Sequence, residues 1–197
     1  MIYTQNDEQM AILEAVKDVK NKRALDIGAY HFETFSNTRA LWELGWHIVM
    51  VEPAPHLMSG LVRDLGTDDR VELVCAAMAT EWGLATLYVT ADMLSTTDKG
   101  WRDKRADAAV WLGKMRIRTV TFADISNWFE GFEFVSIDTE GTSVDLCFDM
   151  LNRGWRPTCF CVENDQRMKE LCNVVTGDYG YKLVLSTAEN AVFAKRQ

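Results

Sequence analysis

The chain has 197 residues, of which 48% are hydrophobic and 25% are charged, so it is long enough to form one soluble globular domain with a full core. Its formal net charge of −8 argues against nucleic acid or an anionic membrane as the main partner, because both attract basic surfaces. The N-terminus lacks the basic and apolar regions of a signal peptide, and no apolar run reaches the length of a membrane-spanning helix.

The cysteines are five in number, lie in apolar surroundings and form no CxxC pair. We therefore expect buried thiols in a reducing compartment, the cytoplasm, and neither disulfides nor zinc ligands. The five are Cys75, Cys147, Cys159, Cys161 and Cys172.

The first part of the chain alternates predicted helices with apolar strands. Helices are indicated by apolar residues at helical spacing, and strands by short continuous apolar runs. In chain order we expect a helix over 7–20 capped by Asn6, a strand over 23–27, a helix over 34–44, a strand over 47–51, a helix over 57–65 and a strand over 71–76.

The alternation then breaks. Residues 80–90 have the pattern of a hairpin that turns near Gly83, residues 91–113 show no period, and residues 114–122 alternate basic and apolar side chains as an exposed strand does. We interpret the region from about 80 to 118 as an insertion.

Order resumes after the insertion. The expected elements are a strand over 133–138, a helix over 142–152, a strand over 158–163, a helix over 165–175, and two antiparallel strands over 181–186 and 190–194. Strands that alternate with helices predict a mostly parallel sheet covered on both faces. The sequence therefore predicts a single α/β domain over residues 1–197.

Polar residues follow four of the predicted strands. They are Gly28 after "LDI", Glu52 in "VEP", Asp138 and Glu140 in "SIDTEG", and Glu163-Asn164 in "CVEND". Ligands bind beyond the carboxyl ends of the strands in open parallel sheets. The four strand ends therefore predict one ligand site.

The first two strand ends favour a nucleoside. A glycine after the first strand lets a ligand approach the turn, and a carboxylate 24 residues later can accept hydrogen bonds from a ribose diol. Taken singly, Gly28 is equally a tight turn and Glu52 a solvated strand end. A dinucleotide fingerprint would need glycine where Tyr30 and Glu33 stand, and no GxxxxGK(S/T) phosphate loop occurs. S-adenosylmethionine (SAM) has no phosphate, and its positive sulfonium suits carboxylates.

The chain resembles FkbM-type methyltransferases over about residues 23–196. The resemblance lies in the segments "LDIGA", "VEP", "CAAMATEWGLATLYV", "TVTFADI", "FVSIDTEG" and "NAVFAKR", which occur in this order. It implies a Rossmann-like class I methyltransferase fold with a seven-stranded sheet, SAM as methyl donor, and methyl transfer to a hydroxyl on a sugar or natural product. Three positions depart from the family pattern: Tyr30 and Phe32 are bulky, and Ser136 stands where lysine is usual.

The resemblance also implies roles for individual residues. Asp26, Gly28 and Ala29 would line the methionine end of the cofactor, Glu52 would hold the ribose, and Cys75 and Ala76 would approach the adenine. Tyr30 and Pro53 complete the expected cofactor set. Tyr30 and Phe32 would narrow the cofactor pocket or cover it as an aromatic lid.

Methyl transfer to a hydroxyl gains from a base within hydrogen-bond reach. The candidates are Asp138, then Glu140, then His31; Glu140 also suits the first turn of a helix, and His31 an exposed loop. Asp138 with Glu163-Asn164 is similar to the acidic set by which catechol O-methyltransferase holds Mg²⁺, although ordinary acids at strand ends explain them as well.

The acceptor is expected to be a small molecule. The stretch 98–118 carries seven Lys/Arg against three Asp, and it is either a cap over an anionic or sugar-containing acceptor or a solvated insertion. Two other functions stay open: a catalytically silent relative that binds the nucleoside as a sensor or partner module, and a nicotinamide-dependent oxidoreductase, which the missing glycines disfavour.

Overall fold

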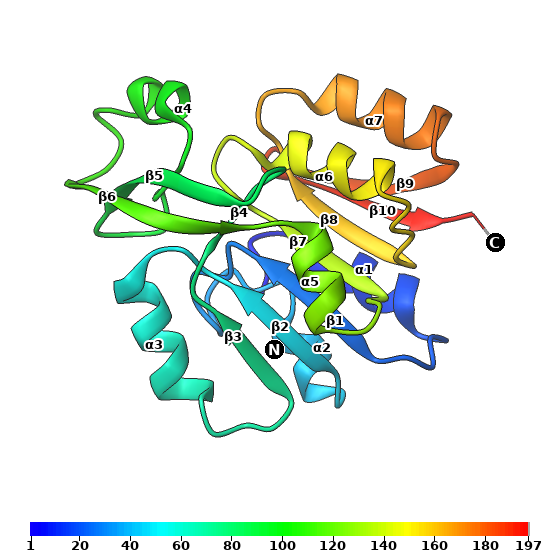
Figure 1. Ribbon diagram of the computed structural model, residues 1–197. Helices are drawn as coiled ribbons and strands as arrows, with labels where there is room; N and C mark the ends of the chain where they lie inside the picture. The colour runs from blue at the N-terminus through cyan, green and yellow to red at the C-terminus, as the bar shows by residue number, and fades with distance from the viewer. Residues whose placement is uncertain (197) are drawn as a thin grey trace.

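The computed structural model describes residues 1–196 and has a seven-stranded sheet at its centre (Figure 1). The strand order is β3-β2-β1-β7-β8-β10-β9; the first five strands run parallel, and β10 is antiparallel to both neighbours. The prediction of a mostly parallel sheet that closes with an antiparallel pair is confirmed. The strands are β1 (Arg23–Ile27), β2 (His47–Val51), β3 (Val71–Val74), β7 (Phe134–Ile137), β8 (Cys159–Glu163), β9 (Tyr181–Ser186) and β10 (Asn190–Lys195).

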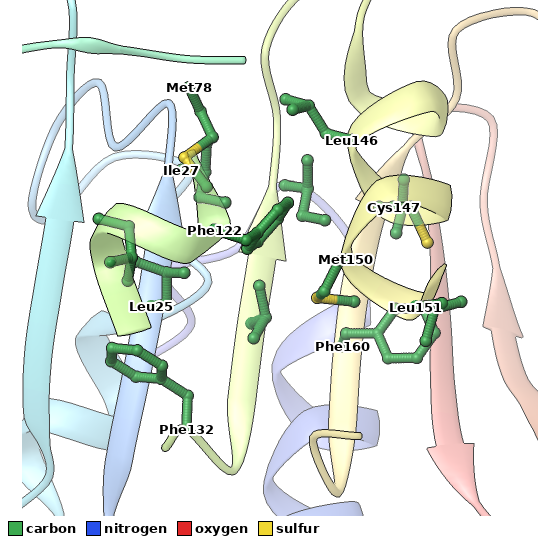
Figure 2. Packing of buried hydrophobic residues seen from close by; sticks show 14 of the residues in the cluster. Leu25, Ile27, Met78, Phe122, Phe132, Leu146, Cys147, Met150, Leu151 and Phe160 are labelled. Atoms are coloured by element: carbon green, nitrogen blue, oxygen red, sulfur yellow. The ribbon is translucent and has the colours of Figure 1, made fainter. Parts of the chain in front are cut away.

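Helices cover both faces of this sheet. One face packs against α1 (Glu8–Val16), α2 (Arg39–Glu43) and α3 (Pro55–Leu65), and the other against α5 (Phe122–Trp128), α6 (Ser143–Asn152) and α7 (Met168–Gly177). Within β1, Leu25 and Ile27 face the second group of helices while Ala24 faces the first. Figure 2 shows how Phe122, Met150 and other buried side chains fill the second layer. The central strands are apolar throughout because both of their faces are buried.

A second, three-stranded sheet forms most of the insertion. Its order is β4-β6-β5, with β4 (Ala77–Met78) parallel and β5 (Gly83–Thr90) antiparallel to β6 (Trp111–Val120). The predicted hairpin near Gly83 is wrong, because β5 pairs with β6 across the connection formed by residues 91–110. That connection contains the unpredicted helix α4 (Lys99–Lys104).

Helix ends differ from the predictions where side chains bond the backbone. The predicted helix over 34–44 begins only at Arg39, because Phe35 has a left-handed φ of +58° and the Ser36 hydroxyl accepts a hydrogen bond from the Arg39 N–H. The first helix starts after Asp7, so Asn6 is not its cap. Helix α5 was missed although Thr121 and Asp124 form a capping box, a pattern readable from sequence.

The thiols are less uniformly buried than predicted. Cys147, Cys159 and Cys161 are buried and Cys172 is half-buried, but Cys75 is exposed because it lies in the turn after β3 has ended. In the part of the chain from residue 1 to residue 196, none of the helices has both the length and the apolar character needed to cross a membrane.

Candidate functional site

Three strand ends meet at one edge of the main sheet. The last residue of β1 lies in register with the last residues of β2 and β7, so the next residues, Gly28, Glu52 and Asp138, come together. Gly28 has φ +80°, and a Cβ built on it would lie 1.6 Å from the carbonyl oxygen of Asp138. Only glycine fits where the ends of β1 and β7 touch.

These residues line a cavity that encloses about 980 Å³ of empty space, part of it open to solvent. Eight of the predicted site residues lie on its wall: Asp26, Gly28, Ala29, Tyr30, Glu52, Pro53, Asp138 and Glu140. Residues that were not named as site candidates complete the wall, and they include Phe35, Asn37, Ala77, Met78, Met93, Thr96, Thr139 and Asn190. Ala77 and Met78 form β4, and Asn190 begins β10. Phe35, Asn37, Met93 and Thr96 lie outside the named helices and strands, and the spacing of residues along the chain carries no signal for their contacts.

Four predicted or suspected residues lie elsewhere. His31 is exposed, and its Nδ1 accepts hydrogen bonds from the backbone N–H groups of Glu33 and Thr34. Cys75 and Ala76 are not on the cavity wall, which β4 reaches with Ala77 and Met78 instead. Phe32 is buried against Trp42, and so only Tyr30 of the two bulky aromatics borders the cavity.

Glu52 is a buried carboxylate held by the backbone. Its Oε1 accepts a hydrogen bond from the Ala54 N–H at 2.8 Å and its Oε2 one from the Tyr30 N–H at 3.0 Å. Burial raises the pKa of Glu52 from 4.5 to about 7. Each oxygen keeps a second lone pair, so the carboxylate can still accept two hydrogen bonds from a ligand.

Asp26 is tied to the loop that follows β1. Its Oδ2 accepts a hydrogen bond from the Thr38 hydroxyl at 2.6 Å, and burial raises the pKa of Asp26 to about 6. The neighbouring Ser136 hydroxyl, where the family pattern has lysine, accepts a hydrogen bond from the Asn37 side chain at 3.0 Å. Asp26 therefore holds the wall of the cavity in place as well as bordering it.

Two further carboxylates lie close to that of Asp138. Ligand oxygens of Asp138, Glu140 and Glu163 all lie within 4.8 Å of one another. Burial, together with the charges of Glu163 and Glu140, raises the pKa of Asp138 well above its ordinary value. Burial likewise raises the pKa of Glu140 and of Glu163. Like charges this close share protons, and a cation that enters the cavity would favour their ionised forms.

Asp165 and Glu163 organise the start of α6. Asp165 accepts hydrogen bonds from the Gly141 N–H at 3.0 Å and the Val144 N–H at 2.9 Å, while Glu163 accepts from the Glu140 N–H and the Ser143 hydroxyl. These bonds satisfy N–H groups that a helix start leaves free. Glu163 at the end of β8 and Asp165 two residues beyond it therefore position the loop that carries Asp138 and Glu140.

Two residues of the insertion donate hydrogen bonds to the loop that carries Asp138 and Glu140. The indole Nε1 of Trp101 donates a hydrogen bond to the Glu140 carboxylate at 2.8 Å, and the Thr96 hydroxyl donates to the Glu140 carbonyl at 2.6 Å. Trp101 also packs on Gly141, whose φ is +110° and where an added Cβ would lie 2.8 Å from the Trp101 side chain. Glu140 itself adopts a left-handed φ of +54°.

The cavity wall is acidic. Four carboxylates border it, and within residues 1–196 none of its lining residues is Lys, Arg or His. Two guanidinium groups of the insertion stack on aromatic rings, that of Arg105 on Trp101 and that of Arg102 on Tyr88. The charge of Arg105 also acts to lower the pKa of Glu140, against the larger effect of burial. The cap over the acceptor stays a prediction.

The suspected Mg²⁺ ligands are only partly brought together. The side-chain amide of Asn164 donates a hydrogen bond to the Ala188 carbonyl, and the third acid near Asp138 and Glu163 is Glu140. Glu163 Oε2 already accepts two hydrogen bonds and Glu140 Oε2 accepts one from Trp101. Carboxylate oxygens that already accept hydrogen bonds fit a cluster of acids that share protons more closely than a set of free oxygen ligands for Mg²⁺.

Comparisons with known proteins show the fold. No protein-family model matches the chain, and no curated protein matches its sequence. Among solved structures, the precorrin-6y C5,15-methyltransferase of Geobacter metallireducens is 11% identical with a TM-score of 0.55. This match covers 98% of the present chain and 91% of the Geobacter chain. The methyltransferase PaMTH1 of Podospora anserina, solved with bound S-adenosylhomocysteine (SAH), is 12% identical with a TM-score of 0.52. This match covers 96% of the present chain and 78% of PaMTH1. The N-terminal domain of human METTL16 in complex with SAH is 12% identical with a TM-score of 0.50. This match covers 100% of the present chain and 73% of the METTL16 chain. The chain has the Rossmann-like fold of these methyltransferases.

Proposed function

We propose that the protein is a SAM-dependent methyltransferase. The observation that carries the proposal is the convergence of Gly28, Glu52 and Asp138 on one cavity that four carboxylates border. A nucleotide phosphate would meet repulsion from these carboxylates, and among residues 1–196 the cavity wall offers no Lys, Arg or His side chain to offset it. A sulfonium would be attracted, and the fold is one that solved methyltransferases share.

The cavity suggests how the donor would lie. Glu52, with a free lone pair on each oxygen, would accept both ribose hydroxyls. Gly28 borders the cavity and would lie beside the methionine end, and Ala77 and Met78 would border the adenine in place of the expected Cys75 and Ala76. The sulfonium would then lie near Asp138.

The reaction that fits these groups is a displacement at the methyl carbon. An acceptor oxygen forms the new bond to the methyl carbon while the carbon–sulfur bond breaks and the sulfonium becomes the neutral thioether of S-adenosylhomocysteine (SAH). The hydroxyl proton passes to Asp138, with Glu140 as second candidate base. The raised pKa of Asp138 makes its ionised form a stronger base than an ordinary aspartate. We propose a hydroxyl of a sugar or natural product as acceptor, by resemblance to the FkbM family.

A second candidate function is a catalytically silent binding module. It is favoured by Tyr30, which borders the cavity with a left-handed φ of +45° where the family pattern has a smaller residue. A side chain there would leave the nucleoside end of the cavity open and crowd the methionine end.

Calorimetric titration with SAH, followed by mass spectrometry of SAH released from SAM with a panel of hydroxyl acceptors, tests the proposal. We expect SAH to bind and to be released on turnover. Asp138→Asn should keep SAH binding within a few-fold and reduce turnover by about 100-fold or more. Asp178→Asn, which changes an exposed acid after α7, is the matched control and should leave both unchanged. Binding without turnover would identify the silent module, and absence of SAH binding would exclude both.

A further inference from the structure

The outer face of the β5–β6 pair is a basic surface on an acidic protein. The chain has 29 Asp and Glu and a net charge of −8, yet strands β5 and β6 contain no acid and carry Lys114, Arg116 and Arg118. Figure 1 shows the paired strands extending away from the main sheet. We call the surface formed by these three cations and Trp82 the basic ribbon.

Strand register places these cations on one face. Lys114, Arg116 and Arg118 lie opposite Tyr88, Thr86 and Leu84, and alternate residues of a strand share a face. Of the two intervening residues, Ile117 is buried with Leu87 and Ala54 on the opposite face, whereas Met115 is exposed. Successive cations are therefore about 7 Å apart along a straight row.

The cations of the basic ribbon are available to a partner. All three are exposed, and within residues 1–196 none of them forms an ion pair with Asp or Glu. Arg116 donates hydrogen bonds to two neutral oxygens, those of Thr86 and Leu84. At the end of the row the guanidinium of Arg118 lies 5.4 Å from the ring centre of Trp82, whose exposed fraction is 66%.

We propose that the basic ribbon binds a single-stranded nucleic acid. A straight row of exposed cations suits the regular charges of a phosphate backbone, and an exposed indole beside an arginine suits a stacked base. A linear strand touches only the ribbon, and charges beyond a Debye length of about 8 Å are screened from it. A membrane would meet a broader face of this acidic protein, and lipid-binding patches usually gather about four to eight cations. The proposal does not depend on methyl transfer.

The test is fluorescence anisotropy with a labelled oligo(dT) of about 20 nucleotides, using the whole chain without cofactor. Three phosphate contacts on a single strand predict that affinity falls about 20-fold between about 50 mM and 200 mM salt. Exchange of all three cations for Gln should abolish this salt dependence and weaken binding at least tenfold at the lower salt. Trp82→Ala should weaken binding about fivefold or more.

Matched controls separate the ribbon from net charge. The triple exchange Lys20→Gln, Lys169→Gln and Lys182→Gln removes the same charge from exposed positions outside β5 and β6, and Trp128→Ala removes another exposed indole. Both controls should bind as the unchanged protein does. No binding at low salt, or equal loss in the control triple, would overturn the proposal. Equally tight capture by phosphatidylserine vesicles would assign the ribbon to membranes instead, and a dimer that the ribbon exchange dissociates would assign it to a second copy.

Discussion

Replacement of Glu52 by Gln tests whether the cavity holds a buried acid. Glu52 has an exposed fraction of 4%, and its pKa rises from the ordinary 4.5 to about 7 because burial penalises the charged form. The native state therefore holds this proton more tightly than the unfolded chain. The resulting stability is complete below about pH 4.5 and is lost as the pH rises through about 7.

The magnitude follows from the two pKa values. One pKa unit corresponds to about 1.4 kcal/mol, so Glu52 accounts for about 3 kcal/mol of the free energy of unfolding over the whole window. About 2.5 kcal/mol of this falls between pH 5 and pH 8. Gln cannot ionise, so the variant lacks this pH dependence. It also loses one of the two acceptors for the Tyr30 and Ala54 N–H groups, a cost of about 1–3 kcal/mol that is independent of pH.

The assay is urea unfolding followed by tryptophan fluorescence at several values between about pH 5 and pH 8. We expect the difference in unfolding free energy between the unchanged protein and Glu52→Gln to shrink by about 2.5 kcal/mol across this range. Glu72→Gln removes an exposed carboxylate from β3, and its curve should run parallel to that of the unchanged protein. If the Glu52→Gln difference stays constant with pH, the reasoning from burial is wrong.

Further predictions concern the same edge of the sheet. Gly28→Ala should cost at least about 2 kcal/mol in urea unfolding, because a Cβ collides with the Asp138 carbonyl; a neutral result would contradict the close approach. Trp101→Phe should cost about 1–3 kcal/mol, because it keeps the packing on Gly141 and removes the donor to Glu140; an unchanged midpoint would show that this bond contributes little. SAM should bind more tightly as the pH rises from about 6 to 8, whereas SAH, which has no sulfonium, should change less in calorimetry. If the affinities for SAM and SAH change equally with pH, the sulfonium does not interact with the acidic cluster.

The sequence alone was sufficient for the architecture of the main sheet. Continuous apolar runs in β1, β2, β7 and β8 indicate strands buried on both faces, and the alternation with helices indicates a parallel sheet. Such a sheet gathers its strand ends at one edge, so Gly28, Glu52 and Asp138 could be grouped before any coordinates. These inferences succeed because they depend on periodicity and on residues next to strand ends.

Tertiary structure alone decided the loops and the charge environment. The hairpin near Gly83 was misjudged because β5 pairs with a distant strand, and no local pattern specifies a partner across a long connection. The raised pKa values of Glu52 and Asp138 come from burial by segments far apart in the chain. Trp101 reaches Glu140 only because the insertion folds back onto the sheet. The net charge of −8 likewise did not predict the basic ribbon, because a sum of charges over the chain does not record where in space the charged residues lie.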